Sequence, residues 1–446
     1  MNHHFSRRQL RYASAIAFAC LIVFTIYGDF RDLGLKIPTP GATIDKLEAS
    51  PHHAALHLLV PLTSPSLLFC KSLASSILTS YPPPILINFN VTFSMQAIAR
   101  GAKIQGISSY LQRPAFPYEP SDLVLMADGY DVWFQLPPDV LCSRYIESFP
   151  KHSIVFGADK SCWPNHPDSP PCLLAPPSPL PTDAYGPQTE KDIRDRYKFR
   201  PRWLNAGNVI GEWSGMESVY NRGAEIAQRK GDVRSDQGIL LDVWGEELEK
   251  LEYEAEHPNS VKDSHVAGGS GHNNVGRIVM DFESLLFMTM VHSHGDVRWG
   301  WNNMTGNPNI GNRLFPPVGN WASEGSDQWL WLAANIITQR TPALLHFNSQ
   351  KAPLGDEEHA GWWERMWWFH LPGPESSTSA EAQQMAKDKF EAHIVAIRTG
   401  AVDASSWALY NGRFGGAWTD SGQWLDWSEL CGEWDFIGQG GVWGTA

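Results

Sequence analysis

An apolar run of five residues, Leu123 to Ala127, leads directly into two carboxylates, Asp128 and Asp131. A run of this length that is bounded by turn-forming residues is typical of one fully buried strand. Aspartate is depleted in strands and favoured in tight turns, so we expect the strand to end where Asp128 begins. Two acids at the tip of a buried strand are well placed to hold a hard divalent cation against a phosphate group.

The central part of the chain alternates between short apolar runs and longer segments with helical character. Strands are predicted over residues 56–62, 85–89, 123–127, 153–158, 205–211, 278–281 and 343–347. Helices are predicted over residues 101–112, 140–149, 216–230, 236–249 and 380–398, and loops over the proline-dense residues 164–187 and over residues 256–276. This alternation predicts an α/β fold with a mixed, mainly parallel sheet flanked by helices.

The N-terminal segment is apolar enough to enter a membrane. Residues 12–28 carry no charge, and Arg7, Arg8 and Arg11 precede them. The span is close to the lower limit of about 17 residues for a transmembrane helix, and arginines before it keep the N-terminus cytosolic. We therefore predict a single-pass type II protein of the Golgi or endoplasmic reticulum membrane, with the remaining chain in the lumen. A cleaved signal peptide is the alternative, and it gives the same lumenal location.

The predicted lumenal location has a consequence for the six cysteines. Cys20 lies within the predicted anchor, which leaves five further cysteines. Some of these should pair in an oxidising compartment, and Cys162 and Cys172, which flank a proline-rich loop, are the first pair expected. Because five is odd, at least one cysteine stays free or pairs between chains.

Net charge excludes one large class of partners. The formal charge of −13 provides no basic surface for nucleic acid. Twenty tryptophans suit stacking on sugar rings, although tryptophan is also ordinary core material, and we expect packing for most of them.

Three further segments carry polar or small residues in or next to predicted elements. His346 ends an apolar strand, where its imidazole can complete an O,O,N coordination sphere for Mn²⁺; a buried structural histidine is the alternative. Lys351 can meet a diphosphate as a point charge. Asp236 begins a predicted helix. Its carboxylate either caps this helix or forms hydrogen bonds with sugar hydroxyls or acts on the acceptor. The small residues of segment 205–211 allow the backbone to approach a ligand closely.

The order of these motifs resembles the glycosyltransferase domain of the procollagen lysyl hydroxylases and related procollagen glycosyltransferase-like proteins. In that family an Asp-x-Tyr-Asp turn after a strand is followed by a Trp-Pro or Tyr-Pro pair, a Leu-x-Ser-Gly-x-x-Ile-Gly segment, an Asp-Gln helix start and a final Leu-Ile-His-x-Asn. The similar segments here are residues 128–131, 163–164, 204–211, 235–237 and 345–348, and the resemblance covers roughly residues 55–352.

The resemblance implies a GT-A fold, a UDP-sugar donor and a set of site residues. The implied metal ligands are Asp128, Asp131 and His346; the implied nucleotide contacts are Tyr130, Thr63, Lys103, Asn348 and Lys351; and Asp236 and Gln237 would face the donor sugar or acceptor. Lys351 lies one residue nearer to the histidine than the family lysine does. No His-x-Asp follows residue 352, so the family's iron-dependent hydroxylase activity is not expected.

We therefore predict an enzyme, a Mn²⁺-dependent glycosyltransferase that moves a sugar from a UDP-sugar to a hydroxyl of a protein or glycan acceptor. The predicted organisation is a cytosolic tail and signal anchor (1–28), a stem (29–54), a GT-A-like domain (55–352) and a Trp-rich extension packed on it (353–446). One alternative is a catalytically inactive glycan-binding module. A less favoured one is a metal-dependent hydrolase built on His292, His294 and Asp296.

Overall fold

The computed structural model describes residues 54–231, 235–257, 277–303, 329–348, 362–366, 413 and 415–434. Within these ranges, no helix has both the length and the apolar character needed to cross a membrane. The predicted membrane segment over residues 12–28, the predicted helix over residues 380–398 and Lys351 all lie outside the described residues.

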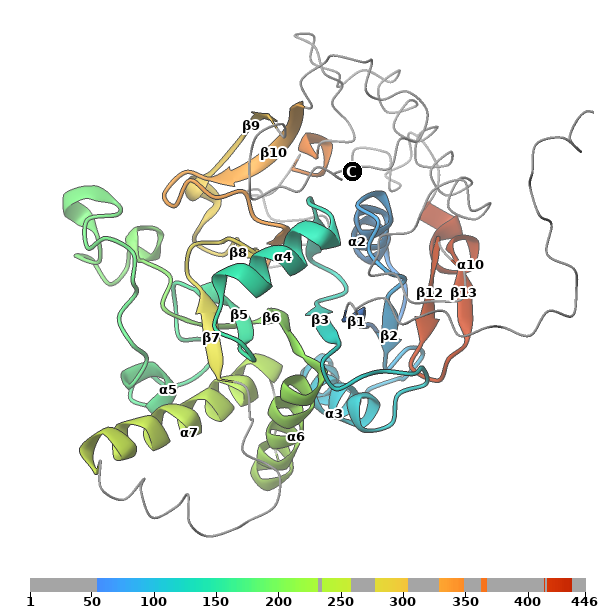
Figure 1. Cartoon of the computed structure of the whole chain (residues 1–446), viewed down its shortest axis with the longest axis horizontal. Coiled ribbons are helices and arrows are strands. Elements are labelled where there is room, and N and C mark those ends of the chain that lie inside the picture. The colour runs from blue at the N-terminus through green and yellow to red at the C-terminus, as the bar shows by residue number, and fades with distance from the viewer. Residues whose placement is uncertain are drawn as a thin grey trace, which may run out of the picture. The chain divides into compact units, whose positions relative to one another are not determined.

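Eight strands form the main sheet, in the order β13-β12-β2-β1-β3-β6-β5-β7 (Figure 1). Their bounds are β1 Leu56–Pro61, β2 Ile85–Ile87, β3 Leu123–Ala127, β5 Ile154–Asp159, β6 Trp203–Glu212, β7 Ile278–Asp281, β12 Gly416–Thr419 and β13 Trp424–Asp426. Strand β6 is antiparallel to both of its neighbours and β13 is antiparallel to β12, whereas the other neighbouring pairs are parallel. The sheet is therefore mixed and mainly parallel, as the alternation of elements predicts.

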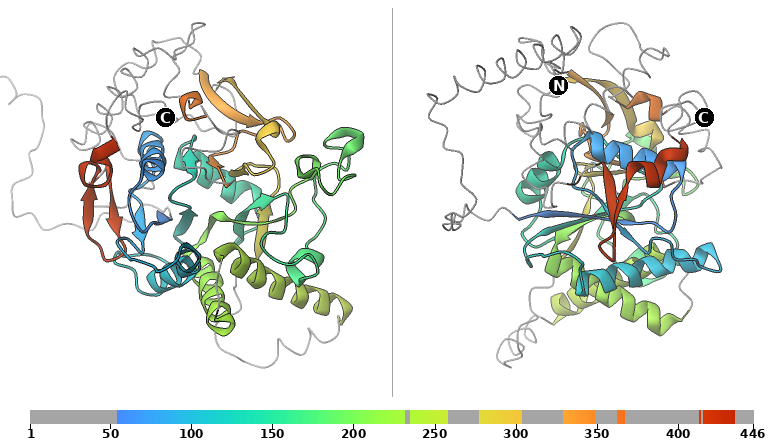
Figure 2. Two further views of the ribbon diagram at one scale, coloured as in Figure 1. Left: turned by 180° about the vertical axis from the view of Figure 1, so that it is seen from behind. Right: turned by 90° about the vertical axis from the view of Figure 1, so that its right-hand side faces the viewer.

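Helices cover both faces of this sheet, which explains why its strands are apolar runs rather than alternating ones. Helices α3 (Gln96–Gln112), α6 (Trp213–Lys230) and α7 (Asp236–Glu256) lie on one face, and α2 (Leu67–Leu78), α4 (Pro138–Ser148) and α10 (Trp427–Cys431) on the other (Figure 2). Successive residues of β1 enter different cores: Leu58 and Val60 pack with α2 and α4, whereas Leu59 packs with α3 and α6.

A smaller sheet lies beside the main one, in the order β4-β11-β8. It contains β4 (Val132–Phe134), β8 (Phe287–Thr289) and β11 (Leu344–His346), with β11 antiparallel to β4 and parallel to β8. Strands β9 (Val297–Asn303) and β10 (Trp329–Asn335) pair as an antiparallel hairpin. Helix α5 (Pro170–Leu173) and the short 3₁₀ turns Gly186–Gln188, Arg196–Lys198, His294–Asp296, Trp363–Arg365 and Gly432–Trp434 complete the described elements.

Helix α2 is the main element that the sequence did not indicate. Every residue from Phe69 to Leu78 is buried, including Lys71. A helix that is buried all round has no amphipathic period, so its strongest signal, apolar residues on one face, is missing. The hydroxyl of Ser66 accepts a hydrogen bond from the Phe69 N–H and caps the helix at its start.

The described C-terminal residues contribute to the main sheet and its core. Strand β12 pairs with β2 in parallel, and Trp362, Trp363 and Met366 are buried in the core that also contains α2 and α4. The domain boundaries at residues 28, 54 and 352 stay predictions. Part of the predicted extension, however, supplies strands of the sheet rather than only packing against it.

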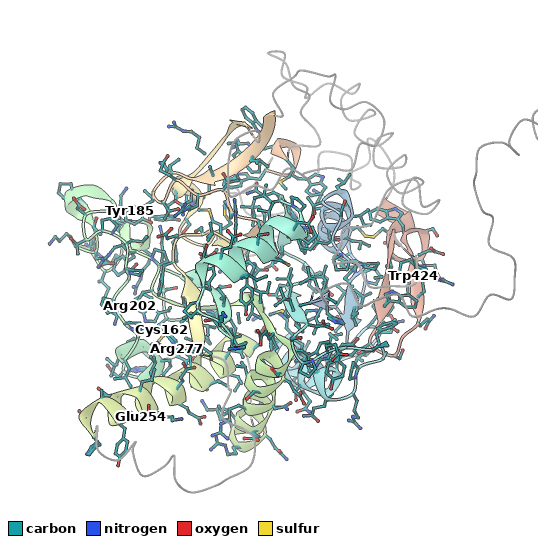
Figure 3. The ribbon with its side chains drawn as sticks, viewed as in Figure 1. Cys162, Tyr185, Arg202, Glu254, Arg277 and Trp424 are labelled. Carbon is teal, nitrogen blue, oxygen red and sulfur yellow. A yellow bond between two sulfur atoms is a disulfide. The ribbon has the colours of Figure 1, made fainter. Side chains whose placement is uncertain are left out.

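Two disulfides join described residues. The predicted Cys162–Cys172 bridge is present, and Cys162 is marked in Figure 3. A second bridge joins Cys70 of α2 to Cys431 of α10 across 361 residues of sequence, while Cys142 is a buried free thiol. The long bridge therefore holds α10 against α2. The sequence did not predict this pairing of cysteines.

Candidate functional site

The structure brings Asp128, Asp131 and His346 together through the pairing of two short strands. Asp128 follows the last residue of β3, and Asp131 immediately precedes β4. Strand β11 runs antiparallel to β4 with His346 opposite Val132, and the Phe347 N–H donates to the Asp131 carbonyl at 2.7 Å. The pairing of β11 with β4 therefore places the His346 imidazole next to the acids that follow β3.

The three side chains fit a divalent cation. Asp128, Asp131 and His346 can each offer one ligand atom so that all three atoms lie within 4.8 Å of one another. His346 Nε2 is 3.6 Å from Asp131 Oδ2 and 3.9 Å from Asp128 Oδ2. Among the described residues, no other group of three or more His, Cys, Asp or Glu side chains has this geometry. Two carboxylate oxygens and one imidazole nitrogen suit Mn²⁺ and related ions.

Lys103 of α3 links the triad to Asp236. Its Nζ lies 2.6 Å from Asp128 Oδ1 and 3.1 Å from Asp236 Oδ2. Burial lowers the pKa of Lys103, but Asp128 and Asp236 raise it by more, so the net pKa lies above its usual value and the ammonium stays charged.

Negative charge is in excess at this point of the fold. Burial raises the pKa of Asp128, Lys103 opposes that rise, and the charges of Asp131 and Asp236 add to it. Three carboxylates therefore surround one ammonium group, and the pKa of Asp128 remains above its ordinary value. A bound divalent cation would relieve this repulsion, because a nearby positive charge favours the ionised form of each acid.

Tyr130 and Thr63 lie together where β1 and β3 end. The Tyr130 hydroxyl donates to the Ser64 carbonyl at 3.0 Å and lies 3.4 Å from the Thr63 hydroxyl. Gly129 lies between the acids, and a Cβ there would come within 2.9 Å of the Pro61 carbonyl oxygen. The glycine therefore permits the turn to pack tightly against β1.

Two other predicted site residues use their amides within the protein. Gln237 donates from Nε2 to the Trp163 carbonyl at 2.6 Å. Asn348 accepts at Oδ1 from the Val291 N–H at 2.8 Å. Both amides therefore hold neighbouring backbone segments in place through hydrogen bonds. Their predicted contacts with sugar or nucleotide stay predictions, as does that of Lys351, which lies outside the described residues.

The residues of the hydrolase alternative are arranged differently. Asp296 accepts at Oδ2 from Lys160 Nζ at 2.7 Å and from the Tyr185 hydroxyl at 2.8 Å. Lys160 also donates to the His292 carbonyl at 2.9 Å. The Asp296 carboxylate thus neutralises a buried ammonium group, and it does not form a metal-ligand group with His292 and His294 among the described residues.

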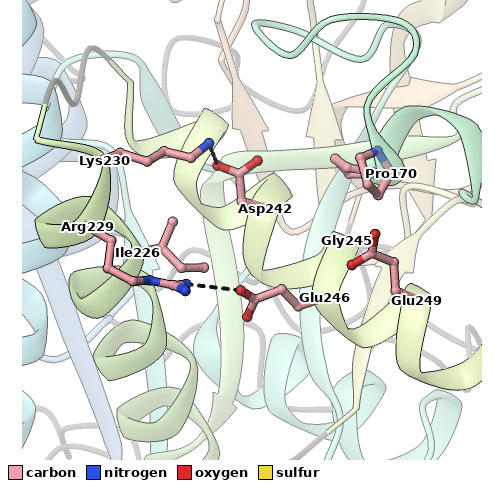
Figure 4. A pocket seen from close by; sticks show the side chains of 9 residues that line it. Pro170, Ile226, Arg229, Lys230, Asp242, Gly245, Glu246 and Glu249 are labelled. Atoms are coloured by element: carbon pink, nitrogen blue, oxygen red, sulfur yellow. Dashed lines mark hydrogen bonds and ion pairs between the residues drawn. The ribbon is translucent and has the colours of Figure 1, made fainter.

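A separate groove of about 350 Å³ lies between α6, α7 and the start of α5. Its walls carry the ion pairs Lys230–Asp242 and Arg229–Glu246 (Figure 4). None of the predicted site residues lines this groove, and four of its five charged side chains pair with one another. It therefore offers no chemistry comparable to that of the triad.

Sequence reasoning missed two buried polar residues behind the triad, Asn205 and Asp159. Asn205 belongs to β6 and contacts His346 at 2.9 Å, and its Nδ2 donates to Asp159 Oδ2 at 3.2 Å. Asp159 ends the otherwise apolar strand β5, and Asn205 lies in a buried part of β6; a polar residue at such a position is the signal that could have drawn attention to each of them.

Comparison with known proteins supports a glycosyltransferase. The family model described as the PLOD GT domain matches residues 94–169, a segment that contains Lys103, Asp128 and Asp131. This match confirms the resemblance to the glycosyltransferase domain of that family over these residues. A search of curated proteins with this sequence finds no match.

One solved structure with partial similarity is that of a glycosyltransferase involved in the glycosylation of the major capsid of PBCV-1. It shares 9% identity with this chain, and the alignment covers 67% of this chain and 94% of the other, with a TM-score of 0.29.

Proposed function

We propose that this protein is a Mn²⁺-dependent glycosyltransferase that transfers a sugar from a UDP-sugar to a hydroxyl group of a protein or glycan. The observation that carries the proposal is the Asp128–Asp131–His346 triad, whose ligand atoms lie within 4.8 Å of one another. Its two acids fall within the segment that matches the PLOD GT domain.

Each residue has a distinct part in this proposal. Asp128, Asp131 and His346 hold the cation, which when bound neutralises charge on the diphosphate leaving group. Tyr130 stacks on the uracil ring, and Thr63 keeps the tyrosine hydroxyl in place. Asn348 and Lys351 are proposed to contact the nucleotide, as the family resemblance implies.

Asp236 acts on the sugar side, next to Lys103. The Lys103 ammonium holds Asp236 close to Asp128, so the Asp236 carboxylate can accept hydrogen bonds from hydroxyls of the donor sugar or the acceptor. Gln237 fixes the start of α7 through its bond to the Trp163 carbonyl, which keeps Asp236 in position. Preorganised polar groups of this kind need little rearrangement during reaction.

A location in the lumen of the Golgi or endoplasmic reticulum is part of the same proposal. It rests on the apolar N-terminal residues 12–28 that follow three arginines. The two disulfides also support it, because disulfides persist mainly in oxidising compartments.

The test is release of UDP from a panel of UDP-sugars by the full chain, with and without Mn²⁺. Asp131→Asn should abolish release, because it removes one charged ligand of the cation. Asp296→Asn is the matched control: both aspartates are 6% exposed, but Asp296 pairs with Lys160 instead of facing His346. Because Asp296→Asn also leaves the buried Lys160 ammonium unpaired, turnover is compared per folded molecule. Retained turnover of the folded control and loss in folded Asp131→Asn would support the transferase. Metal-independent release, or the reverse order of the two variants, would refute it.

A further inference from the structure

The imidazole of His346 is held from behind by a buried amide. His346 Nδ1 lies 2.9 Å from Asn205 Oδ1, while Nε2, on the other side of the ring, faces Asp128 and Asp131. Asn205 is 1% exposed and His346 is 3% exposed. Water therefore cannot replace this contact, and whichever group lies at Nδ1 decides where the ring carries its proton.

Neighbouring groups fix the orientation of the Asn205 amide. The Gly207 N–H, which can only donate, lies 3.1 Å from Oδ1. Nδ2 lies 3.2 Å from Asp159 Oδ2 and 3.3 Å from Gln237 Oε1. Reversing the amide would set its NH₂ group against an N–H and its oxygen against a carboxylate.

The orientation of Gln237 is fixed in the same way. Its Nε2 lies 2.6 Å from the Trp163 carbonyl, which can only accept. Its Oε1 therefore faces Asn205, where it also lies 3.4 Å from the Ala206 N–H. Each donor in this chain of contacts meets an acceptor, so the assignment does not depend on any single distance.

We propose that Asn205 is a positioning residue of the metal centre. This proposal rests on the metal site of the proposed function. Because Oδ1 of Asn205 must accept a hydrogen bond, Nδ1 of His346 carries the hydrogen and Nε2 keeps its lone pair. The lone pair then points toward the two carboxylates, where a cation would bind. Asp159 and Gln237 act indirectly, because they accept from Asn205 Nδ2 and hold the amide in this orientation. Partners of this kind set the tautomer and the direction of a metal-bound histidine.

The small residue at position 207 belongs to the same device. A Cβ built on Gly207 would lie 2.6 Å from His346 Nδ1 and nearer still to two other ring atoms. Strand β6 thus supplies both the acceptor that orients the ring and the space that the ring occupies. This gives a physical role to the Asn-Ala-Gly segment at residues 205–207.

The test measures Mn²⁺ affinity of the full chain by electron paramagnetic resonance, together with the ¹⁴N coupling of a directly bound imidazole. Asn205→Leu has similar volume but no acceptor, and it should weaken Mn²⁺ binding by about tenfold or more and reduce or alter the ¹⁴N coupling. Asn335→Leu is the matched control. Asn335 is also buried, its Oδ1 accepts from the Ile337 N–H and its Nδ2 donates to Ser284, and neither of these bonds involves His346. It should lose stability and keep the affinity.

A paired exchange provides a rescue that a merely structural role would not produce. The double variant Asp159→Asn/Asn205→Asp reverses the hydrogen bond between these two positions and leaves the total charge unchanged. It also retains an oxygen acceptor for His346 Nδ1, but its new carboxylate faces Gln237 Oε1, which in the original protein accepts from Asn205 Nδ2 at 3.3 Å. We therefore expect a partial recovery, with a Mn²⁺ affinity per folded molecule at least about threefold above that of Asn205→Leu.

Three outcomes would overturn the inference, and they are distinguishable. If the original protein binds no Mn²⁺, the metal site and this inference both fail. If it binds Mn²⁺ and Asn205→Leu binds equally well with the same ¹⁴N coupling, only the role of Asn205 fails. If the paired exchange is as weak as Asn205→Leu, an acceptor at position 205 is not what orients His346.

Discussion

Replacing Gly207 with alanine should disable the metal site while leaving the fold in place. The Gly207 backbone does not need a positive φ angle, so alanine is compatible with its conformation. The obstacle is the His346 ring, which would lie 2.6 Å from the new methyl group at Nδ1 and closer at two other atoms. Contacts below about 3 Å force one partner to move.

The histidine has little freedom to move while remaining a ligand. Its ring is 3% exposed and bonded to Asn205, and its strand β11 pairs with both β4 and β8. Overpacking at such a site typically costs about 1–3 kcal/mol of folding free energy. Displacement of one of three ligands should weaken Mn²⁺ binding by at least about tenfold, or about 1.4 kcal/mol.

Isothermal titration of Mn²⁺ into the folded protein, beside chemical denaturation, separates these two effects. Gly245→Ala is the matched control, since its Cβ would also meet a neighbour at 2.8 Å, the Pro171 ring, but in the groove between α6 and α7. The control should change stability alone. Unchanged Mn²⁺ affinity in Gly207→Ala would refute the reasoning, because it would mean that the ring is displaced without loss or does not bind the cation.

Three further changes probe other parts of the structure. Lys103→Met removes the ammonium that lies among the carboxylates, so Mn²⁺ alone should bind severalfold more tightly while turnover falls by about tenfold or more. Calorimetry and steady-state kinetics would show whether Mn²⁺ affinity and turnover change in opposite directions. Replacing Cys70 and Cys431 with serine should lower the free energy of unfolding by about 2–5 kcal/mol, because their disulfide closes a very long loop; an unchanged denaturation midpoint would contradict this. Tyr130→Phe keeps the ring but loses the 3.0 Å bond to the Ser64 carbonyl, worth about 1 kcal/mol; the KM for the UDP-sugar should rise by about fivefold with kcat little changed, and a loss confined to kcat would argue against a nucleotide role.

The sequence by itself determined six of the eight strands of the main sheet and the polar residues at the ends of some predicted elements. The run Leu123–Ala127 is strand β3, with the predicted bounds, and Asp128 follows it. His346 ends a second buried strand, and Asp236 begins a helix. These signals are local: the length of an apolar run and the polar residue that interrupts it depend on a few neighbouring positions.

Only the tertiary structure decided which of these local elements meet. The sequence of a short apolar strand does not specify which strand it pairs with. The pairing of β11 with β4, which brings His346 to Asp131, could therefore not be predicted from either segment. The contact between His346 and Asn205 joins residues 141 positions apart, and β12 enters the sheet beside β2 from the far end of the chain. Helix α2 was missed because burial on all sides removes the period by which helices are recognised. Long-range pairings are selected by the packing of the whole core, and the orientation of a buried amide or imidazole depends on the groups that this packing places around it.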